Sequence, residues 1–315
     1  MGLELLHYTN NFGLRGILKE KFLRASFYQF LNDPTEFSQA RNFIRKKLAD
    51  EHSLRIGEVF PSHEAAFRRA KAQDEFKDCA NLREVLVRMS DNLAEFTERR
   101  VMEESQPFVA SFSAHAESYE RMNGRLSQWR WYGSSGGYAL VYDEGVLEES
   151  FRQLLGRPEY TLFWTFSNYV SYGDISLEDD EKDVLRKIVR KDLIDFEPQD
   201  VGPLTKIAMR AASFMKDPSY HEEEEYRFVV GRFRDLESMQ FENGVQMPLY
   251  FYERGGAIVP FIKLFNGAAS IPKRIIIGPH EAQERRATAL QMYLDSAGIH
   301  NVEVSQSATP VRSVH

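Results

Sequence analysis

The chain has 315 residues, of which 43% are hydrophobic, 28% charged and 13% aromatic, and its formal net charge is −7. This composition excludes a disordered chain, a collagen-like fibre and a small disulfide-stapled domain. The single cysteine, Cys79, excludes an intramolecular disulfide and a zinc site built from cysteines. The negative charge excludes a general polyanion-binding surface, so contact with nucleic acid requires a local basic patch.

Neither a secretory signal nor a membrane span is visible. The N-terminus lacks a basic segment followed by a hydrophobic one, and no apolar run reaches the roughly 20 residues that cross a bilayer. We therefore expect a soluble, cytoplasmic protein without a membrane partner.

The first 30 residues predict two strands around a helix. Residues 3–9 are typical of a strand, and residues 12–21 have apolar positions at helical spacing. Asn10 or Asn11 is the expected N-cap of this helix. Residues 22–30 alternate sufficiently to predict the second strand.

The segment 35–105 is charged, poor in glycine and helical in its period, and it predicts an insertion of about three helices with a break near Pro61. Strands are then predicted at 107–113, 138–142, 160–172, 226–231, 257–264, 274–278 and 302–305, and helices at 126–132, 177–195, 201–215 and 281–297. Strands at both ends with helices between them predict an α+β fold in one domain, 1–315.

Two segments could bind a ribose, an amide or a phosphate. At the end of the first predicted strand, His7 can donate to a ribose hydroxyl, Tyr8 can stack on a ring, and Thr9 can bond a phosphate or amide. Ser111 and Ser113 share one face of a later strand and suit the same partners. Both segments also have ordinary interpretations, as a surface histidine at a strand end and as an exposed strand face.

A third segment, residues 24–36, ends a predicted strand in turn residues. Tyr28 lies on this strand, opposite the strand that ends in a histidine, and Asn32 and Asp33 close it. A strand followed by a capped helix explains Asn32, Asp33 and Pro34 without any function.

The fourth segment, residues 221–227, is an acidic run that leads into an apolar strand. Because side chains alternate along a strand, Glu223, Glu225 and Arg227 are predicted to point one way. Two carboxylates and an arginine on one face shift each other's pKa and can polarise a hydroxyl. Four consecutive acids are ordinarily a solvated loop. The zinc-binding helix motif lacks its second histidine here, so we expect no metal.

The order of these segments is more specific than any one of them. HYT, GLxGIL, LNDPxE, SFS, W-x-x-Y-G, E-x-E-Y-R and IIIGP follow one another along the chain, and Ser307, Pro310 and Arg312 come near its end. Over nearly the full chain, this pattern resembles a bacterial family described as a domain of unknown function. Its opening also resembles the ADP-ribosyltransferase superfamily, which implies a split β-sheet core with flanking helices.

The resemblance to ADP-ribosyltransferases implies an enzyme with NAD as its substrate. It implies that His7 holds the adenosine ribose, that Tyr28 stacks on nicotinamide, and that Glu225 or Glu223 bonds the nicotinamide ribose. Glu225, Glu223 and Tyr28 are then the catalytic residues. The implied NAD-binding residues are His7, Tyr8, Thr9, Arg24, Asn32, Asp33, Ser111, Ser113 and Arg227.

The function implied is a mono-ADP-ribosyltransferase that acts as a toxin or phage-defence effector on a nucleic acid, with RNA favoured, or on a protein. An antitoxin or chaperone is then an expected partner. Arg41, Arg45 and Lys46, on the helix after LNDP, are a candidate phosphate track. A non-catalytic sensor or interaction module that binds NAD or a nucleotide, and a glutamate-dependent hydrolase or nuclease, are the alternatives.

Overall fold

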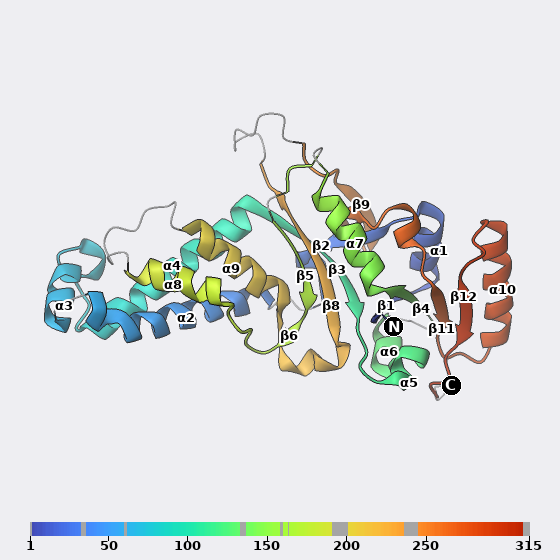
Figure 1. Cartoon of the computed structure of the whole chain (residues 1–315), viewed down its shortest axis with the longest axis horizontal. Coiled ribbons are helices and arrows are strands. Elements are labelled where there is room, and N and C mark those ends of the chain that lie inside the picture. The colour runs from blue at the N-terminus through green and yellow to red at the C-terminus, as the bar shows by residue number, and fades with distance from the viewer. Residues whose placement is uncertain are drawn as a thin grey trace. The chain divides into compact units, whose positions relative to one another are not determined.

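The computed structural model in Figure 1 describes residues 2–32, 36–59, 62–132, 137–157, 160–162, 164–190, 201–235 and 245–310. The chain divides into two compact units, each built from segments that are distant in sequence. The first, which we call the sheet unit, comprises Met1–Leu31, Pro107–Val170 and Ser219–His315. The second, the helical unit, comprises Asn32–Gln106 and Ser171–Pro218. The fold is α+β with a large mixed sheet, as the order of the elements predicts.

The sheet has ten strands in the order β12-β11-β4-β1-β3-β2-β10-β9, and β8 joins it by pairing with β3 and β5. β1 pairs antiparallel with β3 and β4, β2 with β3 and β10, β9 with β10, β4 with β11 and β5 with β8, whereas β11 and β12 are parallel. The strands are β1 Glu4–Thr9, β2 Leu23–Phe27, β3 Ser105–Ser113, β4 Tyr138–Asp143, β5 Trp164–Tyr169, β8 Glu225–Phe233, β9 Tyr250–Arg254, β10 Ala257–Leu264, β11 Arg274–Ile277 and β12 Glu303–Gln306.

Helices cover one face of this sheet, which we call the apolar face. Alternate side chains of the strands, such as Leu5, Phe112 and Phe228, form the main hydrophobic core with three helices, α1, α7 and α10. Leu6 and Tyr8 point to the opposite face, where they pack with Trp129 of α6. The α-helices of this unit are α1 Asn11–Glu20, α5 Ser118–Asn123, α6 Leu126–Tyr132, α7 Glu144–Leu155 and α10 Gln283–Ser296, and its 3₁₀ turns are η1 Tyr28–Phe30, η4 Pro218–Glu223 and η6 Gly267–Ser270.

The sheet splits at β3. This strand pairs with β1 at Ser113 and with β2 at Val109 and Phe108, so neither pairing reaches Ser111. The carbonyl oxygen of Ser111 instead accepts a hydrogen bond from Nδ1 of His7, at 3.1 Å. A histidine side chain thus takes the place of a ladder bond where β1 and β2 diverge.

The first helix begins as the sequence predicts. The side chain of Asn10 accepts a hydrogen bond from the backbone N–H of Gly13 and caps α1. A Cβ atom at Gly13 would lie 2.0 Å from Oγ1 of Thr9, so any larger residue here would force the side chain of Thr9 to shift.

The helical unit confirms the long insertion and its break. Ser62 caps α3 after α2 ends at Val59. The segment after residue 170 also belongs to this unit, because α8 and α9 pack on α2; the sequence predicted these helices but not their membership. The elements are α2 Glu36–Val59, α3 His63–Lys71, η2 Asp74–Phe76, α4 Leu82–Glu104, β6 Ser171–Tyr172, α8 Asp179–Arg190, α9 Val201–Phe214 and β7 Met215–Lys216. In the described ranges, no helix is both long enough and apolar enough to span a membrane.

We expect the helical unit to lose stability in acid through His52. This buried side chain of α2 hydrogen-bonds Ser90 of α4 at 3.2 Å, and burial lowers the pKa of His52 to about 4. The unfolded chain binds the proton below about pH 6.5, whereas the folded chain does not, so stability present above that pH falls as the pH approaches 4. From about pH 8 to about pH 5 the loss is about 2 kcal/mol.

Urea denaturation followed by circular dichroism at the two pH values measures this loss. Asparagine in the His52→Asn variant keeps a hydrogen-bond donor that does not titrate. Between the two pH values, the variant is therefore expected to avoid most of the loss of about 2 kcal/mol that the wild type shows. An equal loss in both proteins would contradict the assignment.

Candidate functional site

Polar side chains gather on the face of β2, β3 and β8 that lies opposite the main core. Phe112 of β3 and Phe228 of β8 belong to that core. Because side chains alternate along a strand, the residues next to each phenylalanine point to the opposite face. The same alternation applies to β2, where Leu23 and Ala25 are core residues. We call the resulting set the polar face: Arg24, Ser26, Ser111, Ser113, Glu225 and Arg227.

Glu225 and Arg227 form a buried ion pair on this face. Nε of Arg227 donates to one carboxylate oxygen of Glu225 at 2.7 Å, and its Nη2 donates to the other at 2.8 Å. The two residues are 5% and 1% exposed, so both charges are withdrawn from water. The sequence prediction that these residues share one face of a strand is confirmed.

Glu223 does not share this face, contrary to the alternation predicted from the sequence. It ends the 3₁₀ turn η4, and Glu224 has φ = 42°, in the left-handed region. The extended strand therefore begins only at Glu225, because one left-handed residue breaks the period-two alternation. Non-glycine residues adopt this conformation where surrounding contacts hold them, often at functional sites.

The contacts that hold Glu224 belong to a network at the end of β3. Nδ1 of the buried His115 donates to Oε2 of Glu224 at 3.0 Å, which leaves Nε2 as an acceptor. Tyr8 donates its hydroxyl proton to that nitrogen at 2.7 Å and accepts from the backbone N–H of Arg125 at 2.9 Å. Burial lowers the pKa of His115 and raises the pKa of Tyr8. Both side chains are therefore neutral at pH 7. The network holds these segments in position and does not activate a nucleophile.

Arg125 adds charge to this network. Its guanidinium group pairs with Glu120 and also with Glu224, at 2.9 Å from Oε2 of the latter. The hydrogen bond from Arg125 lowers the pKa of Glu120. His115, Glu120 and Glu224 offer ligand atoms that lie within 4.8 Å of one another, as a metal site requires. The guanidinium of Arg125 already pairs with both carboxylates, so a divalent cation would have to displace it.

We expect Tyr8→Phe to lower the free energy of unfolding by about 1–3 kcal/mol. The substitution keeps the ring packed on Trp129, with centroids 4.9 Å apart, but leaves the Arg125 N–H and His115 Nε2 without their partner. Urea denaturation measures the change. Tyr119→Phe, at a position that is 53% exposed, is the control and is expected to change stability little. Equal stability of Tyr8→Phe and the wild type would contradict the network.

His7 and Thr9 lie away from the polar face. His7 follows Leu5 in the alternation, and its ring contacts Phe112 on the apolar face, with centroids 5.6 Å apart. Burial lowers the pKa of His7, against an opposing effect of its bond to Ser111. Thr9 lies over the first turn of α1. The structure therefore places the HYT segment around the split in the sheet, with only Tyr8 on the side of the polar face.

Tyr28 does not lie on a strand, which corrects the sequence prediction. β2 ends at Phe27, and the turn η1 begins at Tyr28, whose ring meets that of Phe27 edge-on at 4.8 Å. The alternation of β2 therefore does not set the direction of the Tyr28 side chain, which was expected to stack on nicotinamide. Asn32 is exposed, and Asp33 lies outside the described residues.

The other segments that carry the resemblance support the packing of Trp129. A Cβ atom at Gly124 or Gly278 would lie within 3 Å of its indole ring. Its Nε1 donates to the carbonyl of Asn123, which also accepts from the hydroxyl of Ser307. These contacts join the W-x-x-Y-G, IIIGP and C-terminal segments structurally. Arg312 lies outside the described residues.

The proposed phosphate track in the insertion is neutralised within the helical unit. Arg41 pairs with Glu98 at 3.2 Å, and Arg45 lies 3.5 Å from Asp91. Lys46 pairs with Asp174 at 3.0 Å. These exposed pairs reduce the positive potential that a phosphate backbone would meet.

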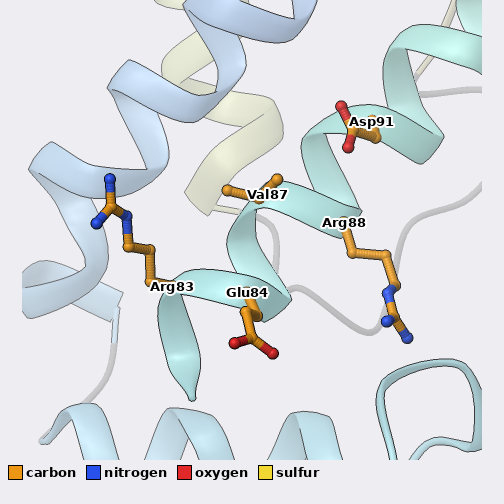
Figure 2. Close-up of a pocket in the computed structure, with 5 residues that line it drawn as sticks. All are labelled: Arg83, Glu84, Val87, Arg88 and Asp91. Carbon is orange, nitrogen blue, oxygen red and sulfur yellow. The ribbon is translucent and has the colours of Figure 1, made fainter. Parts of the chain in front are cut away.

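A hollow on α4 is lined by Arg83, Glu84, Val87, Arg88 and Asp91 (Figure 2). Its two arginines extend in opposite directions (Figure 2). Glu84 accepts from the N–H of Ala80, and Arg88 donates to the carbonyl of Glu75 at 2.7 Å. These side chains secure the start of α4, so the hollow does not present convergent chemistry.

One comparison with known proteins gives a match. Residues 128–228 match a family described as a protein of unknown function (DUF2971). The span runs from α6 into β8 and includes Glu225 and Arg227, but neither β1, β2 nor β3. This match supports the resemblance to a bacterial domain of unknown function, and the description of the family assigns no activity. No curated protein and no solved structure matches the chain.

Proposed function

We propose that this chain is a mono-ADP-ribosyltransferase that takes NAD as its substrate, with the part of the polar face on β3 and β8 as its site. The observation that carries the proposal is the gathering of Ser111, Ser113, Glu225 and Arg227 on one face of two paired strands. Hydroxyls and a carboxylate on adjacent strands suit the ribose hydroxyls of a dinucleotide. The splitting of the sheet at β3 also supports the fold that the resemblance implies.

Glu225 is the proposed catalytic residue. Cleavage of the bond between nicotinamide and ribose develops positive charge on the ribose, and a fixed carboxylate stabilises that charge more in the transition state than in the ground state. Arg227 holds both oxygens of Glu225, which fixes the carboxylate plane. A carboxylate oxygen can accept more than one hydrogen bond, so Glu225 has the chemistry to accept from a ribose hydroxyl.

The remaining predicted residues take different places in this proposal. Ser111 and Ser113 bind the dinucleotide. His7 is a positioning residue, because its bond to the Ser111 carbonyl sets the position of β3 at the split. Glu223 has no catalytic part, because it lies outside the strand.

The acceptor in this proposal is a nucleic acid, with RNA ahead of DNA, and the biological role is that of a toxin or defence effector held by an antitoxin. Support for the role comes from the resemblance alone. A second candidate is a binding module of the same fold without catalysis. It is favoured by the ion pair itself, because both oxygens of Glu225 are already bonded to Arg227.

Incubation with NAD labelled in its adenylate part, together with cell lysate, separates these candidates. A transferase leaves label on a macromolecule, and digestion with nuclease or protease shows which kind. The binding module predicts a thermal shift with NAD but no transferred label. Absence of both would contradict each candidate.

A further inference from the structure

Two cations lie directly opposite each other on β2 and β10. Arg24 is the cross-strand partner of Lys263 in the register of this antiparallel pair. Like charges in such positions destabilise a sheet unless something neutralises them. Among the described residues, no carboxylate lies within ion-pairing distance of either side chain. An acidic protein therefore keeps an unneutralised pair of cations at this position.

Aromatic rings hold the two cations in place. The guanidinium carbon of Arg24 lies 4.8 Å from the ring centroid of Tyr252 and 5.1 Å from that of Phe261. Nζ of Lys263 lies 4.1 Å from the ring of Tyr250 and 4.4 Å from that of Phe22. Contact with the negative faces of these rings stabilises each cation without removing its charge. The arrangement is therefore fixed and still attracts an anion.

Both cations and the two tyrosines are only partly buried. The rings of Tyr250 and Tyr252 belong to β9, which ends the strand order at one edge of the sheet. The hydroxyl of Ser26 lies 3.3 Å from that of Tyr252. We define the cation–tyrosine surface as Arg24, Ser26, Tyr250, Tyr252 and Lys263.

We propose that the cation–tyrosine surface binds single-stranded nucleic acid. The two cations contact phosphates of the strand, and the outer face of the Arg24 guanidinium and the exposed parts of the tyrosine rings stack on unpaired bases. A strand with both phosphates and free bases fits this combination better than an acidic peptide, which has no bases to stack. The role of this surface in holding the acceptor of a transferase rests on the proposed function, whereas the binding of nucleic acid does not.

The test measures binding of a fluorescent oligouridine of about 12 nucleotides by anisotropy, without NAD. Arg24→Glu and Lys263→Glu are each expected to weaken binding at least about tenfold. Each is also expected to reduce the slope of log affinity against log salt concentration by about 0.7, as expected for the loss of one phosphate contact. Arg285→Glu, an exposed arginine on α10 over the opposite face, makes the same charge change and is expected to leave binding unchanged.

Thermal stability distinguishes ligand binding from a structural role. Each single reversal loses the cation–ring contacts but turns a repulsive cross-strand pair into an attractive one, so the melting temperature is expected to change little. No binding by the wild type, equal loss in Arg285→Glu, or equally tight binding of duplex RNA or polyglutamate would overturn the inference. Transfer without oligouridine binding would contradict this inference alone, and binding without transfer would contradict the proposed function alone.

Discussion

Arg227→Met is expected to lower the free energy of unfolding by about 3–5 kcal/mol. Methionine fills much of the same volume, but the carboxylate of Glu225 then stays buried without the guanidinium that pairs with it. Glu225→Gln/Arg227→Met removes both charges and is expected to recover most of that loss, because neutral residues in place of a buried ion pair are often tolerated. Urea denaturation of the two variants and the wild type measures the difference.

The control for this change is the exposed pair of Arg68 and Glu64, whose side chains are 75% and 73% exposed. Arg68→Met is expected to alter stability by less than about 1 kcal/mol. If Arg227→Met cost no more than Arg68→Met, the pair on β8 would be solvated and the geometry of the proposed site would be wrong.

Transfer of ADP-ribose is expected to fall by about 10²–10³-fold in the Glu225→Gln/Arg227→Met variant. The double variant is expected to keep the fold, so the loss would report the missing negative charge at the ribose rather than unfolding. Glu223→Gln is expected to transfer at nearly the wild-type rate, because Glu223 lies in η4 and not on the strand face. If only Glu223→Gln lost transfer, the catalytic residue would be Glu223 and the assignment to Glu225 would be wrong.

Elements with local signals could be predicted from the sequence. Asn10 before a helical period predicted the cap of α1, and Pro61-Ser62 predicted the break between α2 and α3. The alternation in E-Y-R-F predicted that Glu225 and Arg227 share a face. Each of these signals lies within a few residues of the structure that it specifies.

What depends on contacts between distant segments could not be predicted. Tyr8, His115 and Glu224 are separated by more than 100 residues from one partner to the next, and His115 follows the serine motif without a pattern of its own. The left-handed backbone at Glu224 follows from that network and displaces Glu223 from the strand. Tyr28 differs for a local reason, since β2 ends one residue before it.

The central claim is that the polar face holds NAD so that Glu225 can promote its cleavage. The most direct test incubates the protein with NAD and with RNA and protein from a lysate. Chromatography then measures the nicotinamide that is released. The wild type and Glu222→Gln, which removes an exposed carboxylate three residues away, are expected to release nicotinamide and transfer the label at similar rates. Glu225→Gln/Arg227→Met, shown to be folded by circular dichroism, is expected to do both about 10²–10³-fold more slowly. Release by this double variant at the wild-type rate would contradict the claim.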